Sequence, residues 1–181
     1  YYNKIAEGYL KEPYEEAMKV ANYFRKQGIM VAVNWSGSKG LHIHIPLSEL
    51  IFNDNRINND PKLFIVSLAE AIETTVLDKS ARSSTIDYVV LSRNKGLQRL
   101  PCTKHSKSKL YSNFIPIGED YDTAIRHLLL ENPSYLPEII DKQENTDRFL
   151  ALNLVKEAIA TATKNKADEN YSDEYANPHY N

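Results

Sequence analysis

The chain has 181 residues, of which 42% are hydrophobic, and its 22 Lys and Arg nearly balance its 24 Asp and Glu, for a net charge of −2. A chain of this length fits one domain that buries about 70% of the surface its unfolded form exposes. The single cysteine excludes a disulfide framework and a cysteine-rich zinc module. No apolar run approaches the roughly 18 residues that span a bilayer, and no signal-peptide pattern opens the chain, so we expect a soluble, cytoplasmic protein without membrane contact.

The charges are unevenly distributed along the chain. Residues 88–118 contain no Asp or Glu but hold six Lys and Arg. A stretch of this kind is either a solvated strand and loop or a surface that faces a polyanion. The sequence also opens with Tyr1 rather than Met, and we expect it to be a segment of a longer chain.

Apolar periodicity predicts a first helix over residues 13–27. Pro13 suits the first helical position, and Gly28 supplies a C-terminal cap. Apolar side chains recur at helical spacing along one face of this segment: Ala17, Val20, Ala21 and Phe24.

Two short strands are expected next, at residues 29–33 and 41–45, with a turn rich in Gly and Ser between them. The first strand is apolar throughout, whereas the second alternates apolar residues with histidines. Strict alternation places His42 and His44 on the same face of the strand. The whole segment predicts a β-hairpin.

The rest of the chain predicts an α/β or α+β domain with a mixed sheet. A helix is expected over residues 61–77, with Asp60 as its N-cap. Further strands are expected at residues 85–91, 96–100 and 110–117, the last an edge strand because it holds Pro116, and further helices at residues 122–130, 137–141 and 146–163. Residues 164–181 hold few aliphatic side chains and predict a polar tail or linker.

Residues 36–40, Ser-Gly-Ser-Lys-Gly, have the composition of a phosphate-binding turn. Glycines let backbone N–H groups approach an anion closely, Ser36 and Ser38 add hydroxyl donors, and Lys39 adds a charge. His42 projects from the strand that leaves the turn. The segment runs from strand to strand and lacks the P-loop pattern, and a plain Gly/Ser hairpin turn is the alternative interpretation.

A zinc site at His42 and His44 is a further alternative, because two imidazoles on one face of a strand can bind this metal. The remaining histidines, which are His105, His127 and His179, do not form a suitable set of further ligands. We therefore interpret His44 as an ordinary strand residue and expect no zinc.

Asp87 lies in an apolar segment that is predicted to be a strand, where Asp is disfavoured. A carboxylate placed there costs stability unless it binds a cation or a hydrogen-bond donor. Asp87 is therefore either a solvent-facing edge residue or the ligand of a divalent metal.

A basic segment follows over residues 99–107. Arg99 and His105 lie on either side of a proline-containing turn, and Lys107 follows two residues later. Arg and Lys are the side chains that hold a triphosphate. The alternative is a basic surface loop.

Together these motifs resemble the archaeo-eukaryotic primase superfamily, which includes the small catalytic subunit of archaeal and eukaryotic primases, plasmid primase-polymerases and the polymerase domains of bacterial end-joining ligases. Residues 36–42 are similar to its second motif, Ser-Gly-x-x-Gly-x-His, and Ile86-Asp87 resembles its third, a hydrophobic residue followed by a metal-binding Asp. Residues 99–101, 105–107 and 114–117 resemble the Arg-x-Pro, the His-x-Lys and the strand that follow this Asp. The order agrees over residues 34–117, roughly half of the chain.

The resemblance implies a primase-polymerase fold over residues 1–163, in which an αβ unit packs with a unit like the RNA-recognition motif and the C-terminal part is helical. It implies template-dependent nucleotidyl transfer in DNA replication, by an enzyme that makes or extends short RNA or DNA primers with two Mg²⁺ or Mn²⁺ ions. Asp87 would hold a metal and would be catalytic together with His42.

The same resemblance implies the ligands of the protein. The incoming nucleoside triphosphate would contact Ser36, Ser38, Lys39, His42, Arg99, His105 and Lys107. A single-stranded DNA template would be the second substrate, and a helicase or a large primase subunit would be a partner. The composition, rich in Asn, Lys, Ile and Tyr, indicates an AT-rich genome and a plasmid or another mobile element.

One family motif is missing from this sequence. The first motif, Asp-x-Asp at the end of a strand, should precede the helix at residues 13–27, but no Asp occurs before Asp54. We expect the longer chain to supply this motif upstream of Tyr1 and to be an enzyme. The alternative is a non-catalytic nucleotide- or nucleic-acid-binding module derived from the same fold.

Overall fold

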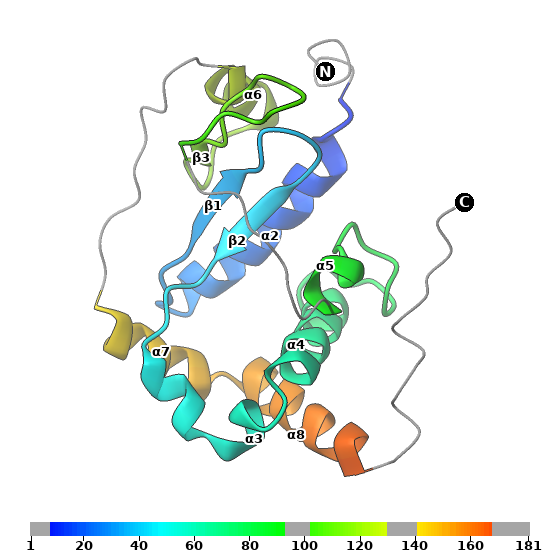
Figure 1. Ribbon diagram of the computed structural model, residues 1–181, viewed down its shortest axis with the longest axis vertical. Coiled ribbons are helices and arrows are strands. Elements are labelled where there is room, and N and C mark those ends of the chain that lie inside the picture. The colour runs from blue at the N-terminus through cyan, green and yellow to red at the C-terminus, as the bar shows by residue number, and fades with distance from the viewer. Residues whose placement is uncertain (1–7, 93–101, 130–140, 168–181) are drawn as a thin grey trace. The chain divides into compact units, whose positions relative to one another are not determined.

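The computed structural model describes residues 8–92, 102–129 and 141–167, and it combines helices with one small sheet (Figure 1). These residues form seven α-helices, one 3₁₀ helix and an antiparallel sheet of three strands. The chain divides into two compact units, which we describe separately. Unit 1 comprises Tyr1–Pro46 and Gln98–Asp141, and unit 2 comprises Leu47–Leu97 and Lys142–Asn181. None of the described helices has the length and apolar character needed to cross a membrane.

The described residues of unit 1 form the sheet and two helices. Its helices are α2 (Lys11–Lys26) and α6 (Tyr121–Leu129), and its strands are β1 (Ala32–Trp35), β2 (Leu41–His44) and β3 (Phe114–Ile115). The strand order is β2-β1-β3, so β1 is central and both of its pairings are antiparallel. Helix α2 runs along the β1–β2 hairpin (Figure 1).

The strand register gives the sheet of unit 1 one apolar and one polar row of side chains. The apolar row is Val33, Ile43 and Ile115, and the second row is Asn34 and His42 with the aromatic Phe114. Residues that pair across antiparallel strands share a face of the sheet, so the two rows lie on opposite faces. Val33 and Ile115 are fully buried, as is Phe24 of α2, and these side chains form the core of unit 1.

The predicted first helix and the β-hairpin are confirmed, with shifted boundaries. Strand β1 begins at Ala32 instead of residue 29, because the segment after Gly28 is tied to the helix end by the Ile29 N–H, which donates to the Phe24 carbonyl (3.0 Å). The predicted edge strand is confirmed as β3 but is short, because Pro116 has no N–H to continue the ladder. The strand predicted at residues 96–100 and the helix predicted at 137–141 lie outside the described residues, apart from Asp141.

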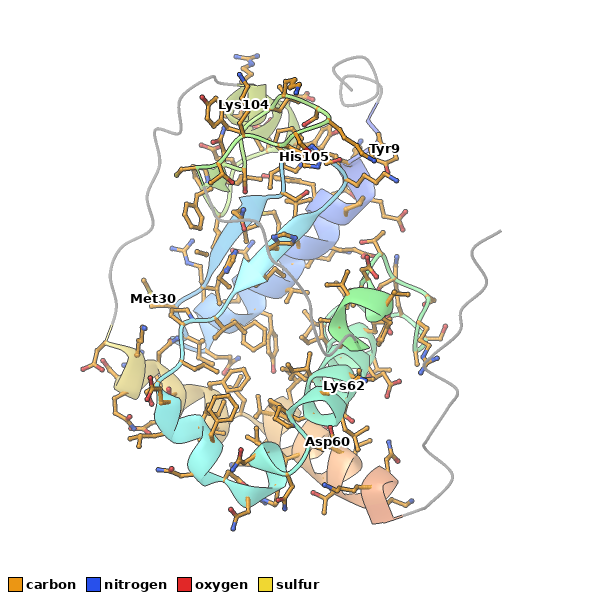
Figure 2. The ribbon with its side chains drawn as sticks, in the orientation of Figure 1. Tyr9, Met30, Asp60, Lys62, Lys104 and His105 are labelled. Atoms are coloured by element: carbon orange, nitrogen blue, oxygen red, sulfur yellow. The ribbon has the colours of Figure 1, made fainter. Side chains whose placement is uncertain are left out.

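All secondary structure among the described residues of unit 2 is helical. It contains η1 (Glu49–Asn53), α3 (Asn55–Asn58), α4 (Pro61–Thr75), α5 (Tyr88–Ser92), α7 (Lys142–Ala151) and α8 (Asn153–Ala167). Helix α4 packs along α8, and buried apolar side chains from both helices, such as Phe64 and Val155, form the core. The predicted cap of α4 is confirmed, because Asp60, at the start of the helix in Figure 2, accepts the N–H of Leu63 (2.9 Å).

Three predictions for unit 2 are wrong. The segment predicted as a strand at residues 85–91 forms helix α5, which begins directly after Asp87. The helix predicted over residues 146–163 is two helices, since the chain leaves helical geometry at Leu152. Helix α8 then continues to Ala167, so residues 164–167, predicted as part of the polar tail, are helical. A run of a few apolar residues does not by itself distinguish a strand from a helix, which explains the first error.

Candidate phosphate-binding site

The turn of residues 36–40, which we call the serine-glycine turn, is closed by its own side chains. The hydroxyl oxygen of Ser36 accepts the N–H groups of Ser38 (3.4 Å) and Gly40 (3.3 Å). The indole N–H of Trp35 donates to the Ser38 carbonyl (3.2 Å). Two of the backbone donors predicted to face an anion thus donate to Ser36. No described group accepts from the N–H of Lys39, whose side chain is exposed.

Gly37 occupies a position in this turn that only glycine fits. Its φ of +80° lies in the left-handed region, which side chains with a Cβ rarely adopt. A Cβ added to Gly37 would lie 3.0 Å from the Cβ of His105 and 3.1 Å from the carbonyl oxygen of Leu110. The close approach of these residues shows that the serine-glycine turn packs against the segment that carries His105.

That second segment also folds into a turn, residues 105–109, which we call the lysine turn. Lys104 and Tyr111, on either side of the turn, pair in an antiparallel β-bridge. Inside this bridge, the N–H of His105 donates to the Leu110 carbonyl (2.8 Å). The Nδ1 atom of His105 accepts the N–H groups of Lys107 (3.2 Å) and Ser108 (3.1 Å). Because Nδ1 is an acceptor, a neutral His105 ring carries its hydrogen on Nε2. Figure 2 shows His105 beside the β1–β2 turn.

A direct hydrogen bond joins the two turns. The hydroxyl of Ser108 donates to the carbonyl oxygen of Gly37, across 71 residues of sequence. Lys39 of the serine-glycine turn is exposed, and so are Lys107 and Lys109 of the lysine turn. The structure therefore brings together the two turns that carry the predicted site residues Ser36, Ser38, Lys39, His105 and Lys107.

The predicted pair of strand histidines is also on one face, as expected. Burial lowers the pKa of His42 below its usual value, and burial together with the neighbouring His42 lowers the pKa of His44. The ring centroids are 6.2 Å apart. The Nδ1 atom of His42 is buried and has no hydrogen-bond partner among the described residues. His42 is thus a neutral group near pH 7, suited to hydrogen bonding rather than to charge pairing.

Asn34 belongs to this polar face, and the sequence analysis did not identify it. Its Oδ1 atom is 2.5 Å from Nε2 of His44, and its Nδ2 atom donates to the hydroxyl of Ser112 (2.7 Å) and to the Trp35 carbonyl (3.1 Å). Because Nδ2 is the donor, Oδ1 accepts from a protonated Nε2 of His44. This hydrogen bond holds the ring of His44, which lies in strand β2 as expected. Asn34 pairs with His42 across the hairpin, which would have identified it as a member of this face. This pairing can be known only from the strand register.

Asp87 lies in unit 2, directly before helix α5 and not in the predicted strand. Its carboxylate is exposed and accepts the N–H of Val90 (3.1 Å), and its carbonyl accepts the N–H of Leu91 (3.2 Å). These bonds make Asp87 the N-cap of α5. Its assignment as a metal ligand stays a prediction. Arg99 lies outside the described residues.

A second carboxylate of unit 2, Glu73 of α4, is fully buried and was also missed. It accepts hydrogen bonds from the N–H of Arg82 (2.5 Å), from the N–H (3.0 Å) and hydroxyl of Ser84, and from the Tyr88 hydroxyl (2.5 Å). Burial raises the pKa of Glu73, but the bonds from Ser84, Tyr88 and Arg82 outweigh it and hold the pKa below its usual value. With all these donors in place, Glu73 anchors the segment that leads to Asp87.

The described residues do not fit a two-metal site. They contain no cluster of three or more His, Cys, Asp or Glu side chains that could hold a metal ion, and a two-metal site requires carboxylates shared between the ions. What unit 1 offers is two small turns in contact, with exposed lysines in both, and two half-buried histidines on β2. No family model, curated protein or solved structure matches this chain.

Proposed function

We propose that unit 1 binds the phosphates of a nucleoside triphosphate between the serine-glycine turn and the lysine turn. We further propose that this binding serves template-dependent nucleotidyl transfer, as in a DNA primase or primase-polymerase. The observation that carries the proposal is the contact of Gly37 with His105 and Ser108, which joins two motifs that are distant in sequence. Phosphoryl transfer asks the protein mainly for placement and for cations beside the phosphates, which is what these turns supply.

The charges and donors in the two turns suit a chain of phosphates. Lys39 and Lys107 are exposed ammonium groups from opposite turns, and each acts as a point charge toward a phosphate oxygen. His42 adds a neutral donor, since burial lowers its pKa. Cations at two places match a ligand with several phosphates better than a single phosphate.

Further parts of the proposal rest on the family resemblance. A single-stranded DNA template is proposed as the second substrate, and a helicase or a large primase subunit as a partner. Mg²⁺ or Mn²⁺ would accompany the nucleotide and neutralise charge on its phosphates, and Asp87 is the carboxylate proposed to hold a metal. Because the described residues alone do not fit a two-metal site, we derive no catalytic step through the ions.

Nucleotide binding tests the first part of the proposal. Trp35 is the only tryptophan of the chain, and its indole hydrogen bond to the serine-glycine turn makes its fluorescence a reporter of that turn. We expect saturable fluorescence changes with dATP and Mn²⁺. Lys39→Ala and Lys107→Ala should each weaken binding about tenfold, as expected for the loss of a charged hydrogen bond.

Lys19→Ala is the matched control, because Lys19 is an exposed lysine of α2 in the same unit. It removes the same charge and should leave the affinity unchanged. Equal losses in all three variants would indicate only a general effect of net charge. No binding to the unaltered protein would contradict the proposal.

Primer synthesis tests the second part. The full-length protein is incubated with single-stranded template, labelled nucleotides and Mn²⁺, and the products are separated by size. Asp87→Asn should abolish synthesis, because Asn keeps the capping oxygen of α5 but removes the charge that a metal needs. If this variant extends primers as well as the unaltered protein, the role proposed for Asp87 is wrong.

A non-catalytic nucleotide- or nucleic-acid-binding module is the second candidate. It is favoured by the cap that the Asp87 carboxylate forms on α5 and by the lack of a carboxylate cluster among the described residues. Nucleotide binding and primer synthesis, measured together, distinguish the two candidate functions. A binding module retains the fluorescence response to dATP but makes no product, even as the full-length protein with Mn²⁺.

A further inference from the structure

Ser108 occupies the junction between the two turns and uses both its hydroxyl and its backbone. Its Oγ donates to the Gly37 carbonyl and accepts the N–H of Leu110 (3.3 Å). Its own N–H donates to Nδ1 of His105 (3.1 Å). Ser108 is half-buried, whereas Ser106, two residues earlier, is exposed. The hydroxyl of Ser108 therefore makes a side-chain hydrogen bond from the lysine turn to the serine-glycine turn.

Other hydrogen bonds give the lysine turn its shape. His105 N–H donates to the Leu110 carbonyl, and Lys109 N–H donates to the His105 carbonyl (2.9 Å). These bonds hold the shape of the turn without involving residues 36–40. Loss of the Ser108 hydroxyl would leave these bonds in place, and it would remove the acceptor of the Leu110 N–H and a link between the turns.

We propose that Ser108 is a positioning residue for nucleotide binding, an inference that rests on the proposed function. Its hydroxyl holds Lys107 and His105 in register with Lys39, so that cations and donors from both turns meet the same phosphates. A preorganised clamp loses less conformational freedom when the ligand binds, so the link between the turns raises affinity without touching the ligand.

The test compares Ser108→Ala with two matched variants in the Trp35 fluorescence titration with dATP and Mn²⁺. Ser108→Ala should raise the dissociation constant about tenfold, the size expected for one lost hydrogen bond in a buried contact. Ser108→Thr keeps the hydroxyl and should recover most of the affinity. Ser106→Ala removes an exposed hydroxyl from the same turn and should have no effect.

A double-mutant cycle distinguishes positioning from a general loss of structure. If Ser108 acts by placing Lys107, then Ser108→Ala should cause almost no further loss of affinity in a Lys107→Ala background. Fully additive losses would overturn the inference. The thermal midpoint of each variant is measured alongside, and Ser108→Cys, a weaker donor of similar size, replaces Ser108→Ala if the latter does not fold. If Ser108→Cys binds dATP as tightly as the unaltered protein, the inference about Ser108 is also overturned.

The outcome separates this inference from the proposed function. If the unaltered protein does not bind dATP, the proposed function fails and the inference falls with it. If it binds dATP and Ser108→Ala binds equally well, only the role of Ser108 is wrong.

Discussion

The serine-glycine and lysine turns of unit 1 and the segment around Asp87 in unit 2 both contain polar residues in an apolar setting, but they use them differently. In the two turns of unit 1 the lysine side chains, such as those of Lys39 and Lys107, are exposed. The hydrogen bond that joins the turns is made by uncharged groups, the Ser108 hydroxyl and the Gly37 carbonyl. In unit 2 the carboxylate of Glu73 is fully buried and accepts hydrogen bonds from three residues. A polar group whose hydrogen bonds are all made inside the protein supports the fold, whereas an accessible charge on a rigid support is available to a ligand.

The largest effect is expected from a substitution in unit 1 that disrupts the contact between the serine-glycine turn and the lysine turn. Gly37→Ala places a Cβ 3.1 Å from the Leu110 carbonyl at a φ of +80°, so both strain and overlap oppose folding of the turn. We expect a loss of about 2–3 kcal/mol in the free energy of unfolding, with loss of nucleotide binding. Urea denaturation followed by Trp35 fluorescence measures the first effect.

Gly40→Ala is the control, because a Cβ at Gly40 meets no atom within 4 Å. It should change the unfolding free energy by less than about 0.5 kcal/mol. Equal costs at the two glycines would show that the contact between the turns contributes nothing to stability.

The next effect concerns the buried carboxylate of unit 2. Glu73→Gln replaces a charged acceptor with an amide whose NH₂ group faces the donors of Arg82, Ser84 and Tyr88. We expect a loss of about 2 kcal/mol in unfolding free energy, measured by urea denaturation and circular dichroism. Glu157→Gln, at an exposed position of α8, should cost almost nothing; a similar loss there would refute the structural role of Glu73.

The Glu73 carboxylate also predicts how acid affects stability. Its folded pKa lies below the ordinary value of 4.5, so its charged form binds the donors and its contribution is complete above that value. The contribution is lost as the pH falls through the lowered pKa of the folded state. Denaturation midpoints measured from pH 6 to pH 3 should fall more steeply for the unaltered protein than for Glu73→Gln. Parallel curves would contradict the prediction.

A smaller loss of stability is expected from substitutions of Asp87, and it distinguishes a capping role from a role in the reaction. Asp87→Ala removes the α5 cap and should cost about 0.5–1 kcal/mol, whereas Asp87→Ser keeps a capping oxygen and should cost little. Both variants remove the charge. If primer synthesis disappears in both although only one is destabilised, the charge of Asp87 acts in the reaction; if activity follows stability instead, Asp87 is only a cap.

The smallest expected effect is the response of unit 1 to mild acid. Burial holds the folded pKa of His42 and His44 below the ordinary 6.5, so the folded state favours the neutral rings. Their contribution to stability is complete above pH 6.5 and is lost as the pH falls through the lowered folded pKa values. His44→Gln should reduce this slope between pH 7 and pH 5.5, measured by thermal denaturation. An unchanged slope would show that His44 titrates as it does in the unfolded chain.

Local patterns predicted most of the described elements and part of the site. The periodicity of Ala17 and Phe24 indicated α2, and Asp60 before a proline indicated the start of α4, because these signals depend on near neighbours. The segment at residues 88–91 was predicted as a strand and is helical, since the cap formed by Asp87 and the bond from Tyr88 to Glu73 outweigh the preference of valine for strands.

Spacing within a few residues was enough to predict α2, α4, the hairpin and the shared face of His42 and His44. The tertiary structure alone decided that Ser108 meets Gly37 and that Asn34 meets Ser112, at separations of 71 and 78 residues. Such contacts depend on the pairing register of β1 with its neighbours and on how the intervening chain closes. No local propensity encodes them, because a propensity describes one segment and a contact of this kind requires two.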